Sequence, residues 1–84
     1  MNNYNKVLAK EAIKQIIPEK IYTKQEIVKF DLIPWSKHEQ TVRRILERGA
    51  LKGKFFEAEH AVNNRWEIKG SDIVEYLKTF SGLK

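Results

Sequence analysis

The first apolar pattern along the chain repeats every three or four residues. Over residues 5–17 this spacing gathers the apolar side chains on one face of a helix, and they are Leu8, Ala9, Ala12, Ile13, Ile16 and Ile17. Pro18 follows, and proline does not continue a helix because it lacks a backbone N–H and clashes with the preceding turn. The pattern predicts an N-terminal helix within residues 1–18 that buries one face.

A second helix signal begins at Thr23, which has Glu26 three residues after it. This is the capping-box spacing, in which each of the two side chains accepts a hydrogen bond from a backbone N–H at the helix start. We expect a short helix here with its apolar side chains toward the core, namely Ile27, Val28 and Phe30.

The same spacing recurs at Ser36 and Glu39 and predicts another helix that runs to Arg48. Gly49 stands where helices commonly end on a residue in the left-handed conformation. Residues 31–35 would form the turn between the two helices. Two short helices around a turn are the pattern of a helix-turn-helix.

Strand-forming residues replace the helical pattern in the next part of the chain. Residues 51–60 and 66–69 contain phenylalanines, a tryptophan and isoleucine, which are types that favour strands. Asn63 and Asn64 suit the turn between them, because asparagine tolerates left-handed dihedrals. The sequence therefore predicts a β-hairpin with its tip at residues 62–65.

Gly70 interrupts the second strand, and a last helix is expected after it. Ser71 is the predicted N-cap, and Asp72 lies where a carboxylate offsets the helix dipole. The apolar face of this helix would hold Ile73, Val74, Leu77 and Phe80. The expected fold class is α+β, a small winged helix-turn-helix that is mostly helical with one β-hairpin wing. Residues 1–84 would form this single domain, with the helix-turn-helix, wing and last helix in residues 21–80.

The charge of the chain adds a functional indication. Its 16 Lys and Arg residues exceed its 11 Asp and Glu residues, which gives a formal net charge of +5, and a positive field favours polyanionic partners. The chain has no cysteine, which excludes a disulfide framework, a thiolate metal site and a cysteine nucleophile. No apolar run reaches the roughly 20 residues of a membrane span. We therefore expect a cytoplasmic protein that binds no membrane.

The helix expected over residues 37–48 separates its side chains by type. A helical wheel places on its buried side Val42, Ile45 and Leu46. The opposite side, which we expect to hold no carboxylate, carries Lys37, Gln40, Arg44 and Arg48, with Thr41 at its edge. These residue types bind phosphates or donate to base edges in the major groove. The alternative is an ordinary solvated helix face.

Charged residues flank this face of the helix. Glu39 and Glu47 lie toward its two sides, and so does Arg43. Arg43 would reach a phosphate or pair with either glutamate on its own helix.

The hairpin is the second basic element. Its candidates for DNA contact are Lys54 on the first strand and, at the tip, Asn63, Asn64 and Arg65. An arginine at such a tip can enter a narrow minor groove or bind a phosphate. A solvated turn without function is the alternative.

The segments TVRRILERGAL and NRWEIKGSDIVEYL resemble the small excisionase-type DNA-binding proteins, which share a winged helix-turn-helix with the mercury-resistance (MerR) regulators. The resemblance covers residues 21–77. It implies a recognition helix that contains residues 41–44, a wing at residues 63–65, and DNA contacts by Arg43, Arg44 and the wing. The segment FDLIPWSKHEQ is longer than the turn usual in that family.

These features together predict a duplex DNA-binding protein with no enzymatic activity and no cofactor. It would be a small transcriptional regulator or an excisionase-like architectural factor of a phage, plasmid or other mobile element. Tight specificity would require a homodimer or a cooperative array on DNA, because one module buries limited area. Two histidines are too few for a metal site, and His38 is expected near the buried side of its helix.

Trp35 is the basis of the main alternative. If its ring is exposed, it would anchor a protein partner, and the winged-helix fold would act as a protein-interaction module. Trp66 alternates with Ile68, which favours burial in the core. RNA binding is a third alternative, but the expected sheet has few exposed aromatic residues and no recognised RNA motif.

Overall fold

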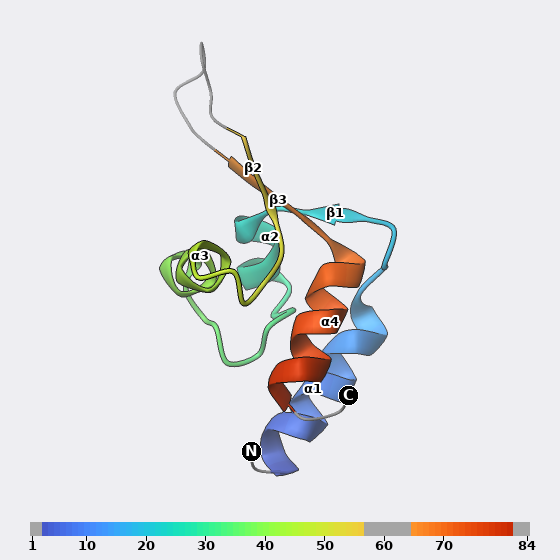
Figure 1. The fold of residues 1–84 in the computed structure, drawn as a ribbon. Coiled ribbons are helices and arrows are strands. Elements are labelled where there is room, and N and C mark those ends of the chain that lie inside the picture. The colour runs from blue at the N-terminus through green and yellow to red at the C-terminus, as the bar shows by residue number, and fades with distance from the viewer. Residues whose placement is uncertain (1–2, 57–64, 82–84) are drawn as a thin grey trace.

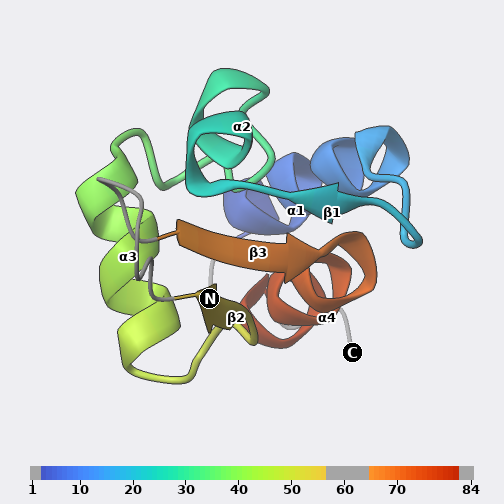
Figure 2. The same ribbon diagram turned by 90° about the horizontal axis from the view of Figure 1, so that it is seen from above.

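The computed structural model describes residues 3–56 and 65–81, which form helices and a three-stranded sheet (Figure 1). The elements in chain order are α1 (Asn3–Gln15), β1 (Ile21–Tyr22), α2 (Lys24–Lys29), α3 (Glu39–Glu47), β2 (Lys54–Phe56), β3 (Arg65–Lys69) and α4 (Gly70–Ser81). α1 and α4 lie side by side on one side of the molecule, and α2 and α3 lie on the other (Figures 1 and 2). The expected α+β class is confirmed. Within the described ranges, no helix is long and apolar enough to cross a membrane.

The sheet contains one strand that the sequence pattern does not predict. β3 is its central strand and pairs antiparallel with both β1 and β2 (Figure 2). Ile21 of β1 is opposite Lys69, and Phe56 of β2 is opposite Arg65. β1 has only 2 residues, too few to show the alternation that identifies a strand. The sequence pattern places Arg65 at the hairpin tip. In the structure it is the first residue of β3, so it belongs to the strand.

One hydrophobic core joins the helices to the sheet. Its buried side chains come from all the helices and from β1 and β3, and include Ala12, Tyr22, Ile27, Val42, Ile68, Ile73 and Leu77. Phe30 does not belong to it, although the sequence pattern directs it inward. Its side chain is 45% exposed, because Phe30 is the C-cap of α2 and lies past the last residue of the apolar face.

The start of α4 touches the turn that follows α1. The amide of Gly70 donates to the carbonyl of Lys20 at 2.8 Å, and the amide of Ser71 donates to the carbonyl of Pro18 at 3.0 Å. A Cβ on residue 70 would overlap the carbonyl oxygen of Ile17, so glycine is required for the close approach. The predicted N-cap role of Ser71 is wrong. α4 begins at Gly70, so Ser71 lies within its first turn, and carbonyls of the turn after α1 accept the first amides of the helix.

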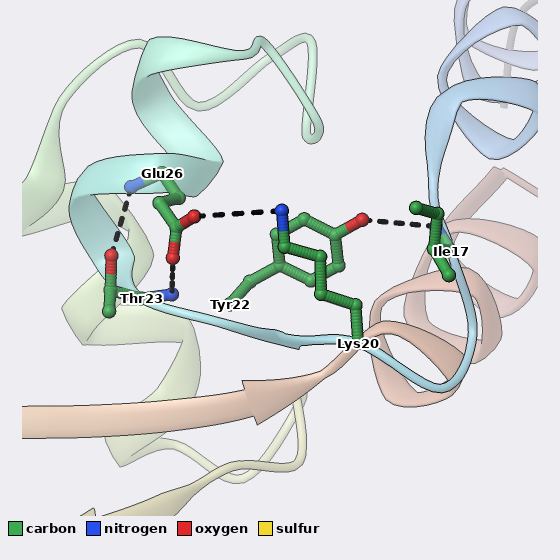
Figure 3. Close-up of polar contacts among 5 residues, drawn as sticks. All are labelled: Ile17, Lys20, Tyr22, Thr23 and Glu26. Carbon is green, nitrogen blue, oxygen red and sulfur yellow. Dashed lines mark hydrogen bonds and ion pairs between the residues drawn. The ribbon is translucent and has the colours of Figure 1, made fainter.

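The capping box of α2 is confirmed (Figure 3). The Thr23 hydroxyl accepts a hydrogen bond from the Glu26 amide, and the Glu26 carboxylate accepts one from the Thr23 amide, both at 3.1 Å. The Lys20 ammonium lies 4.0 Å from the other carboxylate oxygen of Glu26. The Tyr22 hydroxyl accepts a hydrogen bond from the Ile17 amide at 3.0 Å. These bonds tie β1 to the first turn of α2 and to the end of the N-terminal segment.

α3 ends as its sequence predicts. Gly49 has a φ of 80°, and its amide donates to the carbonyl of Leu46 at 3.1 Å. The next amide, of Ala50, donates to the carbonyl of Ile45 at 3.2 Å. This pair of bonds is the Schellman motif, in which glycine supplies the left-handed residue without a steric cost.

α2 ends in the same motif, but with an aspartate in the left-handed position. Asp31 has a φ of 53°, and its amide donates to the carbonyl of Val28 at 3.3 Å. The Leu32 amide then donates to the carbonyl of Ile27 at 3.0 Å. Leu32 and Ile33 are both buried. The connection between α2 and α3 therefore turns back at once and packs on the core.

The start of α3 differs from its prediction. The helix begins at Glu39, and His38 is the N-cap residue without a side-chain capping bond. Ser36 is not the cap: it is fully buried, its amide donates to Ile33 at 2.9 Å, and its hydroxyl has no partner within the described part of the chain. His38 is exposed, so its expected position near the core is also wrong. Ser36 and His38 both precede α3 and belong to the connection between α2 and α3. The buried side chains of Leu32 and Ile33 hold this connection to the core.

Trp35 packs inside the molecule's own aromatic cluster. Its indole N–H donates to the Tyr76 hydroxyl at 3.2 Å, and its ring stacks on Phe80 with centroids 4.9 Å apart. Trp35 is partly buried against the core. The ring therefore anchors the α2–α3 connection to α4.

We expect Gly70→Ala to lower the free energy of unfolding by about 1–3 kcal/mol, the usual cost of extra volume in a packed site. In an unobstructed helix the same change would raise it by up to about 1 kcal/mol. Urea unfolding followed by circular dichroism measures the difference. The control is Thr79→Ala at an exposed position of α4, with an expected change within about 0.5 kcal/mol. Unchanged stability of Gly70→Ala would contradict the close approach.

Tyr76 should make stability depend on alkaline pH. Burial raises the pKa of Tyr76 above its ordinary 10.0, and this outweighs the Trp35 hydrogen bond and the Arg48 charge, which lower it. The folded state therefore keeps the proton that the unfolded chain loses, and this contribution is complete below pH 10.0 and is lost as the pH rises through the folded pKa.

The test is Tyr76→Phe, which we expect to lose about 1 kcal/mol at neutral pH with the Trp35 hydrogen bond. The stability gap to the wild type should narrow above pH 10.0, as measured by urea unfolding at several pH values. A gap that stays constant with pH would refute the assignment.

Candidate nucleic-acid interface

α3 presents one polar face to solvent. Its other face is buried through Val42, Ile45 and Leu46, as the helical wheel predicts. The polar face holds Gln40, Arg44 and Arg48, all exposed, with Thr41 half-buried at its edge. The structure therefore places these four predicted site residues on one side of α3. The three buried residues cause this, because they fix the rotation of the helix about its axis.

Arg44 and Arg48 carry the positive charge of this face. Neither guanidinium forms an ion pair within the described residues. Both line a hollow of about 330 Å³ together with Glu47. The expectation of a face without carboxylates is therefore wrong, because Glu47 lies among the arginines and not on a flank.

Arg43 offsets the charge of that carboxylate. Its Nε donates to an oxygen of Glu47 at 2.8 Å, one helical turn along α3. This is one of the two pairings that the sequence allows for Arg43. An exposed pair of this spacing is worth roughly 0.3–0.5 kcal/mol, so a phosphate can replace Glu47 as the partner of Arg43 at little cost.

Lys37 lies outside the helix on which it was expected. It precedes α3, and its ammonium lies 3.1 Å from the Asp31 carboxylate with both side chains exposed. The pair spans the α2–α3 connection. Lys37 remains close in sequence to the start of α3, but its position is set by the connection and not by the helical wheel.

The hairpin supplies fewer described candidates than expected. Lys54 lies in β2 opposite Glu67, and the Nε of Arg65 in β3 lies 3.2 Å from a carboxylate oxygen of the same Glu67. Both cations are therefore at the base of the hairpin beside an acid. The other two candidates, Asn63 and Asn64, lie outside the described residues.

A groove separates the two helices from the hairpin. Its volume is about 360 Å³, and its lining residues are Lys24, Arg43, Glu47, Phe55 and Trp66. Trp66 is half-buried against the core, in line with its predicted burial. The groove adjoins the polar face of α3, because Glu47 lines both.

Two of these residues, Lys24 and Phe55, are not among the candidates that the sequence pattern indicates. Lys24 is the first residue of α2, and no local pattern indicates that this turn faces α3 and the hairpin. For Phe55 a signal exists in the sequence. Phe55 and Phe56 are adjacent in a strand, so they lie on opposite faces of the sheet, and two bulky rings on opposite faces cannot both enter one core.

Within the described residues, no group of three or more histidine, aspartate or glutamate side chains is arranged to hold a metal ion. The polar face of α3 and the groove beside it offer cations, one carboxylate, an amide, a hydroxyl and aromatic rings. These groups bind anions and flat rings. Comparison of the chain with protein-family models, curated proteins and solved structures finds no match. The arrangement of α3, the hairpin and their side chains is the basis for assigning a function.

Proposed function

We propose that this protein binds duplex DNA through the polar face of α3. The observation that carries the proposal is the pair of arginines, Arg44 and Arg48, exposed on one helix face without an ion-pair partner within the described residues. Gln40 shares that face. Arginine and glutamine are the side chains that bind guanine and adenine edges bidentately in the major groove.

The order of the elements supports a winged helix-turn-helix. α2 and α3 are consecutive helices, and the β2–β3 hairpin follows them directly. α3 lies at the edge of the molecule, with one face on the core and the other outward (Figure 2). A second helix in this position enters the major groove in proteins of this geometry. The excisionase-type resemblance of the sequence is consistent with the same assignment.

The side chains fall into two roles. Gln40, Thr41 and Arg44 would read base edges, because they lie toward the exposed centre and N-terminal half of α3. Arg43 and Arg48 would bind phosphates on either side of the groove. Lys37 and Lys54 would add phosphate contacts from the connection and the hairpin.

In the cell, this activity fits a small transcriptional regulator or an excisionase-like architectural factor of a mobile element. One module of this size buries limited area on DNA, so a homodimer or a cooperative array would supply specificity. The alternative of a protein-interaction module centred on Trp35 is disfavoured by its packing. The ring contacts Phe80 and its N–H is bonded to Tyr76.

We expect Arg44→Ala and Arg48→Ala each to weaken binding to a random-sequence 20-base-pair duplex, and Arg48→Ala to lower the salt slope by about 0.9 as one phosphate contact is lost. Fluorescence anisotropy at several salt concentrations measures both quantities. The matched control is Lys10→Ala, which removes the same charge from an exposed position of α1, on the other side of the molecule from α3 (Figure 1). Equal losses in all three variants would mean that net charge, and not α3, governs binding.

The reading role of Arg44 has its own test. Selection from a randomised duplex pool should return a motif for the wild type, and Arg44→Ala should relax one or two positions of it, with a loss of about tenfold on the wild-type motif. Arg48→Ala should keep the same motif with lower affinity. An unchanged motif for Arg44→Ala would remove this residue from the groove.

A further inference from the structure

The groove between α2, α3 and the hairpin has an aromatic wall that the core does not use. Phe55 is 48% exposed, although its neighbour across the sheet, Trp66, packs against the core. The two rings are in tilted contact, with centroids 5.1 Å apart. Contact with a partly buried tryptophan therefore holds one side of the Phe55 ring, and about half of its side chain is exposed.

Positive charge and a hydrogen-bond acceptor stand beside this ring. Lys24 lines the groove and forms no ion pair within the part of the chain that the structure describes. On the α3 side, Arg43 shares its charge with Glu47 at 2.8 Å. The Glu47 side chain is 50% exposed, so its second carboxylate oxygen can accept a hydrogen bond from an amino group.

An aromatic ring, an adjacent cation and an acceptor match the parts of a nucleotide. Proteins bind unpaired nucleotides by stacking the base on an aromatic side chain and holding the phosphate with Lys or Arg. A paired base inside a duplex has both of its faces covered by its neighbours and offers none to Phe55. A base can therefore reach this ring only when it leaves the stack, at a bulge, a distorted step or a single-strand junction.

The position of the groove favours a nucleic-acid occupant over an apolar protein segment. The groove is continuous with the α3 face through Glu47, and the chain carries a net charge of +5. Its volume of about 360 Å³ lies in the range of small-ligand sites, roughly 300–1,000 Å³. An apolar segment would leave Lys24 and the Arg43–Glu47 pair without matching groups.

We infer that this groove holds one unstacked nucleotide of the bound DNA, with its base on Phe55, its phosphate at Lys24 and its amino group on Glu47. The inference rests on the proposed DNA binding and adds a substrate preference to it. DNA with an unpaired base near the α3 site is bound more tightly than fully paired DNA of the same sequence. A base with an exocyclic amino group is favoured over thymine, which has none to donate.

The test compares a fully paired 20-base-pair duplex with the same duplex carrying one extra adenine at its centre. Anisotropy gives both affinities, and 2-aminopurine at the extra position reports stacking by its fluorescence. We expect about tenfold tighter binding of the bulged duplex and a rise in fluorescence as the base leaves its neighbours. Phe55→Leu should abolish both effects and keep binding of the paired duplex, and Lys24→Gln should reduce the preference.

The control is Phe30→Leu, since Phe30 is 45% exposed and lies outside the groove; it should behave as the wild type. Circular dichroism verifies that each variant is folded. Equal affinity of the wild type for the two duplexes, or a preference that survives Phe55→Leu, overturns the nucleotide site and leaves duplex binding intact. Failure of both duplexes to bind overturns the proposed function itself, and the groove assignment with it.

Discussion

The close approach of Gly70 to the turn after α1 is the contact on which the arrangement of the layers depends. β3 leads directly into α4 at this residue, and β1 leaves the same turn in the opposite direction. The missing side chain lets the backbone of the α4 start meet the carbonyls of residues 17–20. With this distance fixed, α4 packs along α1, and β3 lies beside β1. A wider separation here would weaken the packing of α4 against α1 and the pairing of β3 with β1.

The orientation of the candidate binding face on α3 is set by the opposite face of that helix, which is buried in the same core. Ile27 of α2 and Val42 of α3 are fully buried in the same core as Ile68 of β3, so both helices pack into the core that the central strand shares. The two Schellman ends and the packed connection leave the α2–α3 unit little freedom. These contacts hold the outward face of α3 in place, and such a preformed face would lower the entropic cost of the proposed binding.

The sequence allowed prediction of those parts of the fold whose signals are local. The capping box at Thr23, the end of α3 at Gly49 and the division of α3 into two faces follow from the nearest neighbours of each residue. The two-residue strand β1 and the start of α4 at Gly70 depend on contacts between distant segments, which no local pattern contains. The same limit applies to the candidate site. Arg44 lies on the face of α3 that its local pattern predicts. The fold of the connection pairs Lys37 with Asp31, and contacts between distant segments leave Phe55 largely outside the core.

The shortness of β1 has a further consequence for how copies of the chain meet. The edge of a sheet exposes unpaired N–H and C=O groups, and a long flat edge is a template for adding strands from other molecules. β1 offers 2 residues at its edge, and Thr23 starts α2 immediately after them. The chain passes from this strand directly into a helix, so β1 is too short an edge to act as a template for strands of other copies.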